Sequence, residues 1–359
     1  MIKFLHTGDL HLKAPPNEDS EYSLKCLEIL IERANQEAVD AVLLCGDIFD
    51  QEKDYTDKPF CKKVIATFDK ADMPLYYIPG NHEDHDGKFS KFKAINWGNK
   101  IKAIADVSLE TFSKGEEEVE IACIPHRLNY EDFTDWNIPK KQTRHRLAMA
   151  HGSIPGFTFL GDEDDAGVLN PALFVHHEVS HVFMGHIHKA DKLTTFGVDF
   201  FYAGSPRPVR RREEGARGYN IIEIGDSVKV SRKELHDVGV AHNLSFAVLG
   251  QDWAEDIKAA CRHFSEIDRI NVVLEGMVEN KQLVEQEAEE LKEELTKTYR
   301  RVRIKSEYLE PLETLIENEF CKDVYNKWLE KKPDELSGYE YQVWIQMLNS
   351  LRFMMEEFS

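Results

Sequence analysis

The sequence predicts an α/β fold, because short apolar runs alternate with amphipathic helical patterns from the start of the chain. Residues 2–5, 41–45 and 75–78 are apolar runs of strand length. Leu24, Leu27 and Ile31 recur at helical spacing between the first two runs. Each run is followed by a turn that pairs a glycine with a polar residue: Gly8-Asp9, Gly46-Asp47 and Gly80-Asn81. This order is typical of a βαβαβ unit.

Strand patterns dominate the next part of the chain. We expect strands at 119–124, 146–150, 182–185, 198–203, 219–224 and 228–230. Many of these runs also end at a glycine or a polar residue. Because strands from distant parts of a chain can deliver polar residues at their carboxyl ends, this pattern predicts a site at one edge of an α/β sheet.

The last third of the chain changes character near residue 240. Strands at 244–249, 270–274 and 302–304 and helices at 252–263 and 281–298 predict a small α+β domain. Two apolar helical patterns follow, separated by Pro333 and Gly338, which stop helices. We therefore expect three parts: a site-bearing domain at 1–238, a small domain at 242–307 and a helical hairpin at 308–359.

Composition limits the possible partners and locations. The 359 residues carry a net charge of −20, which predicts repulsion from anionic membranes and from DNA as a whole. A nucleic-acid partner would therefore have to meet a local basic patch. The initial apolar run is too short for a signal peptide, and no other run could span a bilayer, so we expect a cytoplasmic protein. The six scattered cysteines suggest reduced, buried thiols.

Seven polar residues in the turns have the chemistry of metal ligands. They are Asp9, His11, Asp47, Asn81, His151, His186 and His188. Residues two apart on an extended segment point the same way, so Asp9 with His11, and His186 with His188, could each aim two side chains at one centre. A single Gly-His-x-His motif could arise by chance. Five different motifs in order, namely Gly-Asp-x-His, Gly-Asp, Gly-Asn-His-Glu, His-Gly and Gly-His-x-His, indicate a site for two metal ions. This Asp, Asn and His set suits Mn, Fe or Zn better than Mg or Ca.

The same residues indicate phosphoester hydrolysis. One carboxylate must bridge two ions that lie close together, and we expect Asp47, at the end of a central strand, to do so. Water shared by two cations becomes a hydroxide nucleophile near neutral pH. His82 follows Asn81 directly, so on an extended turn it should face a bound substrate and donate a proton to the leaving oxygen. His6 and His181 more simply pack around the core.

A basic cluster follows the last ligand pair. It comprises Arg207, Arg210, Arg211, Arg212 and Arg217. Guanidinium groups there could hold DNA phosphates beside the metals. The alternative is a solvated loop whose charge Glu213 and Glu214 neutralise.

Three sequence blocks carry a resemblance to a known family. They are residues 6–12 (HTGDLHL), 46–50 (GDIFD) and 202–206 (YAGSP). With the Asn-His, His-Gly and Gly-His-x-His motifs, the chain resembles the calcineurin-like metallophosphoesterases and, within them, the SbcD-type nucleases related to the meiotic recombination nuclease. The resemblance implies a β-sandwich flanked by helices. Asp50 stands where many archaeal and eukaryotic relatives carry His, which favours the bacterial or phage branch, and Glu83 stands where Asp is usual.

Function is implied by the same resemblance. Asp9, His11, Asp47 and His188 would hold one ion, and Asp47, Asn81, His151 and His186 the other. The usual ion is Mn²⁺, with Fe²⁺, Zn²⁺ or Mg²⁺ as alternatives, and His82 would be the catalytic acid. Such enzymes degrade double-stranded DNA from the 3′ side and cut single-stranded DNA. They form a heterotetramer of a nuclease homodimer with an SbcC-type coiled-coil ATPase, in a bacterial or phage-infected cell and not at a membrane.

The family's domain order also extends to the rest of this chain. Its capping domain, which helps to admit DNA, corresponds to residues 242–307, and its ATPase-binding helices correspond to 308–359. Two other functions stay open. One is a metallophosphatase or cyclic-nucleotide phosphodiesterase on the same fold. The other, an inactive scaffold for an ATPase, is disfavoured because every expected ligand is present.

Overall fold

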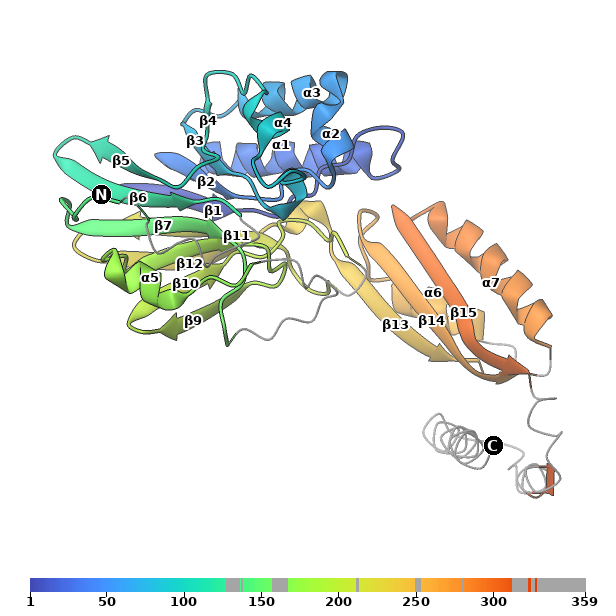
Figure 1. The fold of residues 1–359 in the computed structure, drawn as a ribbon. Helices are drawn as coiled ribbons and strands as arrows, with labels where there is room; N and C mark the ends of the chain where they lie inside the picture. The colour runs from blue at the N-terminus through green and yellow to red at the C-terminus, as the bar shows by residue number, and fades with distance from the viewer. Residues whose placement is uncertain are drawn as a thin grey trace. The chain divides into compact units, whose positions relative to one another are not determined.

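The computed structural model divides the chain into two compact units, Met1–Val240 and Ala241–Ser359 (Figure 1). The structure describes residues 1–126, 136, 138–156, 167–210, 213–248, 253–278, 280–311, 322–323 and 327. Within these ranges, no helix is both long and apolar enough to cross a membrane.

The first unit is a sandwich of two six-stranded sheets. In spatial order, the first sheet contains β12 (Val228–Glu234), β11 (Gly218–Ile224), β1 (Ile2–Thr7), β2 (Ala41–Cys45), β3 (Leu75–Ile78) and β4 (Ile101–Ala103). The second contains β5 (Ser108–Lys114), β6 (Glu117–Ile124), β7 (His145–His151), β8 (His181–Gly185), β10 (Val198–Tyr202) and β9 (Asp191–Thr195). The predicted mixed α/β fold is confirmed.

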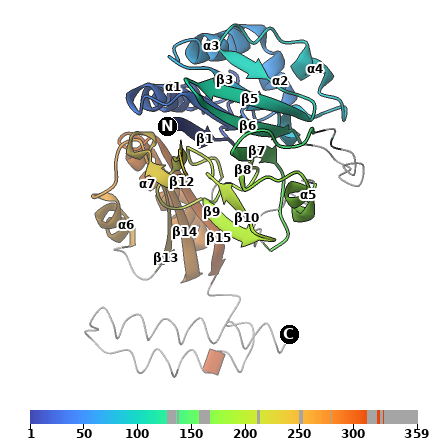
Figure 2. The same cartoon turned by 90° about the vertical axis from the view of Figure 1, so that its left-hand side faces the viewer.

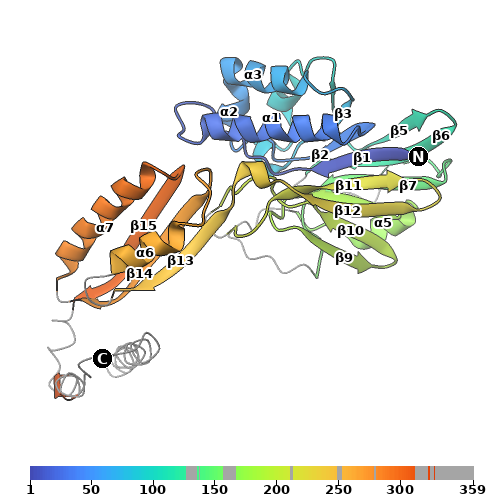
Figure 3. The same ribbon diagram turned by 180° about the vertical axis from the view of Figure 1, so that it is seen from behind.

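Helices cover the outer face of the first sheet. Strands β1, β2 and β3 are parallel, as the predicted βαβαβ unit requires, and α1 (Ser20–Gln36), α2 (Glu52–Thr56) and α3 (Lys58–Phe68) connect them. Figure 3 shows α1 running along this sheet. Strand β2 is buried on both faces, and its side chains alternate: Val42 and Leu44 pack with the helices, whereas Leu43 packs against the second sheet.

The second sheet is covered on its outer face by α5 (Pro171–His176), which Figure 2 shows beside it. The Phe174 ring of α5 lies 5.3 Å from the Phe200 ring of β10, edge to face. Short α4 (Ser90–Lys93) and the 3-10 segments η1 (Asn81–Glu83) and η3 (His236–Val238) also belong to this unit. The inner faces of both sheets meet in one apolar core, which includes Phe4, Leu43 and Met149.

In its described residues up to Pro311, the second unit is a three-stranded parallel sheet with two helices. Its elements are β13 (Ala241–Ala247), α6 (Trp253–Cys261), β14 (Arg269–Val278), α7 (Lys281–Thr296) and β15 (Arg301–Pro311), in the order predicted for the small domain. Ile257 of α6 and Leu291 of α7 share a core with Val272, so both helices cover the same face of the sheet. β15 includes residues 308–311, and Leu309 is buried in this core, so the predicted hairpin does not begin at residue 308. Nearly all of that hairpin lies outside the described residues.

The cysteines in the described ranges are buried free thiols, as predicted. They are Cys26, Cys45, Cys61, Cys123 and Cys261. Cys321 lies outside the described residues.

Candidate metal centre

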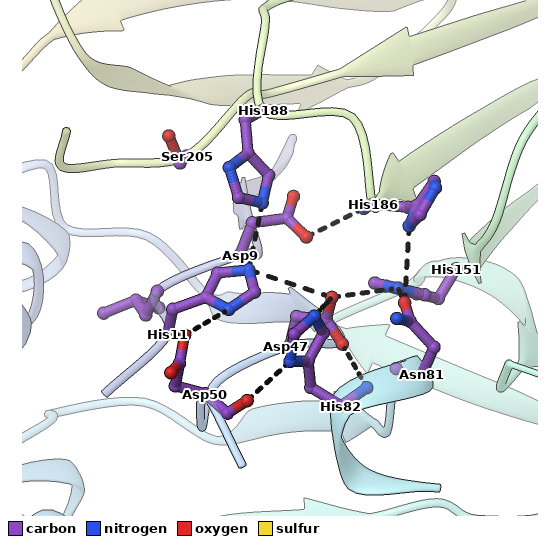
Figure 4. A network of polar contacts seen from close by, with 12 residues as sticks. Asp9, His11, Asp47, Asp50, Asn81, His82, His151, His186, His188 and Ser205 are labelled. Carbon is purple, nitrogen blue, oxygen red and sulfur yellow. Dashed lines mark hydrogen bonds and ion pairs between the residues drawn. The ribbon is translucent and has the colours of Figure 1, made fainter. Parts of the chain in front are cut away.

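All seven residues that the sequence singles out as ligands come together where strands of both sheets end (Figure 4). Asp9 and His11 follow β1, Asp47 follows β2, Asn81 begins η1 after β3, His151 ends β7, and His186 and His188 follow β8. The sheets are in close contact here: a Cβ on Gly185 would stand 1.8 Å from the Cys45 carbonyl oxygen. Glycine at this position lets ligands from the two sheets approach each other.

The ligands form two groups. In the first, Asp9, His11 and His188 are buried, and their ligand atoms lie within 4.8 Å of one another. The Nε2 atoms of His11 and His188 face each other at 2.9 Å. Burial raises the pKa of Asp9 to about 6, because little water reaches its charge.

The second group comprises Asp47, His151 and His186, with Asn81 beside them. The Asn81 Oδ1 atom lies 2.9 Å from His151 Nε2 and 3.3 Å from His186 Nδ1. Burial alone would lower the pKa of His151, but the nearby charge of Asp47 raises it to about 9. Without a metal, a proton on His151 would thus balance the buried carboxylate.

Asp47 lies between the two groups. Its Oδ2 atom is 3.8 Å from His11 Nε2 and 3.4 Å from His151 Nε2. This oxygen is buried and accepts no hydrogen bond from the described residues. Burial opposes its ionisation, but neighbouring histidines, His151 first, hold the pKa of Asp47 well below its usual range. A charged oxygen without a donor, between converging ring nitrogens, fits a pair of divalent cations with Asp47 shared between them.

The backbone at these ligands is strained. Asp9, His11, Asp47 and His186 have φ values of 56°, 48°, 53° and 99°, in the left-handed region that non-glycine residues rarely adopt. Each such residue costs on the order of 1–3 kcal/mol. Asp9 and His11 therefore share a centre through a left-handed turn and not through the extended segment that their spacing suggested. His186 and His188, by contrast, contribute to different groups.

Glu83 supports the loops beneath the centre, a role that the sequence analysis did not identify. Its buried carboxylate accepts hydrogen bonds from the backbone N–H groups of Asp47 (3.0 Å), Phe49 (2.9 Å) and Gly80 (2.8 Å) and from the hydroxyl of Tyr77 (2.9 Å). It thereby ties the turn after β2 to the turn after β3. The only sequence signal was an acidic residue directly after the Asn-His pair.

His82 lies at the more open side of the centre, with 23% of its side chain exposed. Its Nδ1 atom is 2.5 Å from the Asp50 carbonyl oxygen, and its Nε2 atom is 3.9 Å from Asp47 Oδ2. The extended turn expected for this residue is wrong, because His82 belongs to the 3-10 segment η1. The bond to the Asp50 carbonyl places a proton on Nδ1 and turns Nε2 toward the ligand cluster.

Arg207 is not a DNA contact, which corrects the expectation for the basic cluster. The side chain is fully buried, and its guanidinium donates to the carbonyl oxygens of Leu10 (2.6 Å) and His11. Arg217 is also buried and contacts Glu213. Arg210 is half-buried, and Arg211 and Arg212 lie outside the described residues. Part of the cluster therefore supports the centre from the inside, because a buried guanidinium needs acceptors and finds them in the turn that carries His11.

Glu213 is a second contributor that the sequence analysis interpreted differently. Instead of neutralising a solvated loop, it lies 2.5 Å from Nδ1 of the ligand His188. Burial opposes its ionisation, but His188, Val209 and Arg217 lower the pKa of Glu213 to about 2. A carboxylate with this pKa is charged at neutral pH.

His6 belongs to the core, as expected. It is fully buried, and its ring nitrogens lie 3.1 Å from the Met184 carbonyl oxygen and 3.2 Å from Asn220 Nδ2. Burial lowers the pKa of His6 to about 3, so the ring stays neutral.

A double sheet flanked by helices, with two buried groups of candidate metal-binding residues at its strand ends, is the arrangement of a metal-dependent phosphoesterase. The calcineurin-like phosphoesterase family matches residues 2–190, and the chain belongs to this family.

Three known proteins illustrate what the chain is similar to. The chain is 25% identical over 259 residues to the uncharacterized metallophosphoesterase YhaO of Bacillus subtilis. The aligned region covers 66% of this chain and 61% of that protein. It is 25% identical over 245 residues to the DNA double-strand break repair protein Mre11 of Methanosarcina acetivorans, covering 65% of this chain and 39% of that protein. A dimetal phosphatase from Danio rerio aligns in structure with a TM-score of 0.47 and 12% identity, covering 65% and 96% of the two chains. The chain thus spans less than two thirds of both curated relatives.

Proposed function

We propose that this phosphoesterase is an Mn²⁺-dependent DNA nuclease subunit of the SbcD type, a double-strand 3′ to 5′ exonuclease and single-strand endonuclease in DNA end processing, repair and recombination. The observation that carries the proposal is the pair of buried ligand groups that share Asp47, in a chain similar to an archaeal break-repair protein. Mn²⁺ suits the mixed oxygen and imidazole ligands, and Fe²⁺, Zn²⁺ and Mg²⁺ are the alternatives to be compared.

Each residue of the centre has a proposed task. Asp9, His11 and His188 hold one cation, Asn81, His151 and His186 hold the other, and Asp47 contacts both. Two bound cations supply Lewis-acid chemistry and water activation for phosphodiester hydrolysis. His82, oriented by the Asp50 carbonyl, supplies a proton from Nε2 to the leaving oxygen. Its partial exposure at the edge of the centre suits a group that must reach a substrate.

DNA and protein partners are proposed for other parts of the chain. Arg210, Arg211 and Arg212 hold backbone phosphates near the centre, while Arg207 has a structural role. The unit that begins at Ala241 serves as the capping domain that helps to admit DNA. The segment after Pro311 binds an SbcC-type ATPase, and the nuclease forms a homodimer within a heterotetramer. We place this assembly in the cytoplasm of a bacterial or phage-infected cell.

The nuclease is tested with purified full chain, Mn²⁺ and end-labelled linear duplex DNA, beside single-stranded DNA, a cyclic nucleotide and a small phosphomonoester. We expect DNA degradation that weakens as salt rises, because phosphate contacts are screened. Asp47→Asn serves as the inactive control. Turnover of the small esters with none of any DNA would instead identify a phosphatase or cyclic-nucleotide phosphodiesterase.

The partner is tested by truncation. Leu309 is fully buried in the core of the second unit, so a stop codon must follow Pro311 to leave that core intact. We expect the truncated chain to keep nuclease activity and to lose binding to a purified SbcC-type coiled-coil ATPase. Equal binding by the full and truncated chains would contradict this role.

A further inference from the structure

His188, His11 and His151 differ in the groups that lie behind their rings. In the group with Asp9, His188 has a carboxylate behind its ring: Glu213 Oε1 lies 2.5 Å from Nδ1, opposite the Nε2 atom that faces the group. His11 resembles it, with Asp50 Oδ1 at 3.3 Å from Nδ1. In the other group, the Nδ1 atom of His151 is 2.8 Å from a neutral acceptor, the backbone carbonyl of Cys45.

Glu213 is held firmly in this position. Its other oxygen accepts hydrogen bonds from the Val209 N–H at 2.8 Å and the Ser205 hydroxyl at 3.2 Å, and the Arg217 guanidinium lies 3.5 Å away. Only 10% of the side chain is exposed. The carboxylate is therefore fixed by three contacts besides His188, and its orientation toward His188 does not depend on a bound ion.

A carboxylate behind a ligating imidazole fixes the tautomer, orients the ring and makes the ligating nitrogen more basic. A backbone carbonyl orients the ring but carries no full charge. We propose that Glu213, assisted by Asp50, is a positioning residue that makes the Asp9, His11 and His188 site bind its cation more tightly than the Asn81, His151 and His186 site. This inference rests on the dimetal centre proposed above and adds an order of filling to it.

The test measures Mn²⁺ binding to the full chain by the free-ion electron paramagnetic resonance signal, independently of catalysis. We expect two ions with distinct affinities in the wild type. Glu213→Gln should weaken one ion by about 10- to 100-fold, the scale for outer-shell partners, and leave the other unchanged. Glu214→Gln is the matched control, since Glu214 is the exposed neighbour.

Double variants identify the affected ion. Combined with His188→Ala, Glu213→Gln should cause no further loss, because both changes act on one site. Combined with Asn81→Ala, its loss should add to that of the other site. Asp50→Asn, at a position with 19% side-chain exposure, should lower the affinity of the same ion. If Glu213→Gln lowers the melting temperature of the metal-free protein, the Asp50→Asn variant decides whether the positioning role holds.

The outcomes separate the two proposals. A wild type that binds no Mn²⁺ would refute the dimetal centre itself. The positioning role would be overturned if Glu213→Gln and Asp50→Asn left the affinities of both ions unchanged, or if each variant lowered both affinities equally. In either case the dimetal centre itself would not be refuted.

Discussion

Replacing Glu83 with Gln should destabilise the protein and the turns that carry the metal centre. Each carboxylate oxygen accepts two hydrogen bonds: Oε1 from the Phe49 N–H and the Tyr77 hydroxyl, and Oε2 from the N–H groups of Asp47 and Gly80. A Gln amide has only one oxygen, and its NH₂ group takes the place of the other. In either orientation this NH₂ group, itself a donor, therefore faces two donors that have lost their acceptor. If it faces Tyr77, the hydroxyl can rotate and accept, and one buried backbone N–H loses its partner.

The cost follows from these contacts. A buried donor left without an acceptor costs about 1–3 kcal/mol, and a charge-assisted hydrogen bond that becomes neutral loses about 1 kcal/mol more. Burial, together with the nearby charge of Asp47, raises the pKa of Glu83, so removing its charge offsets part of the loss. We therefore expect a net destabilisation of about 2–4 kcal/mol.

Urea unfolding of the metal-free protein measures this effect, and Mn²⁺ binding measures its consequence for the ligand Asp47. Glu32→Gln is the control, because Glu32 is exposed on α1 and should change stability by less than about 0.5 kcal/mol. If Glu83→Gln matched Glu32→Gln in both stability and Mn²⁺ affinity, the supporting role of the carboxylate would be refuted.

Three further expectations concern the same centre. Gly185→Ala should lower the free energy of urea unfolding by about 1–3 kcal/mol and weaken Mn²⁺ binding, because its Cβ would stand 1.8 Å from a backbone carbonyl oxygen. Gly225→Ala is the control and should be neutral, because its Cβ would meet nothing within 4 Å. His82→Gln should keep both ions but slow DNA hydrolysis by roughly 10²- to 10⁴-fold, and unchanged turnover would exclude it as the acid. In the metal-free protein, the pKa of His151 rises from 6.5 to about 9. The contribution of the His151–Asp47 pair to protein stability is thus complete below pH 6.5 and is lost as pH rises through 9. The loss is on the order of 3 kcal/mol. Thermal unfolding curves that do not change over this pH window would contradict this prediction.

Most of the fold was predictable because its signals are local. The apolar runs at 2–5, 41–45 and 75–78 became β1, β2 and β3, and the glycine turns after them carry ligands. The second unit also has its expected strands and helices. Strand pairing and the extension of β15 to Pro311 were not predictable, because they depend on partners elsewhere in the chain.

The sequence did not reveal the residues that support the centre. Arg207, Glu213 and Glu83 are all charged, and charged residues in loops are usually exposed. Each is buried here because its partners come from other turns: Arg207 meets the Leu10 carbonyl 197 positions away, and Glu213 meets His188 from 25 positions away. No local pattern encodes such contacts.

By itself, the sequence determined which residues have metal-ligand chemistry and that each follows a strand end, because ligand type and strand periodicity are written in neighbouring residues. Only the tertiary structure decided that left-handed turns aim Asp9 and His11, and that carboxylates stand behind the rings of His11 and His188. The physical reason is distance along the chain. The two sheets bring together side chains from Asp9 to Glu213, and only their packing sets which atoms face one another.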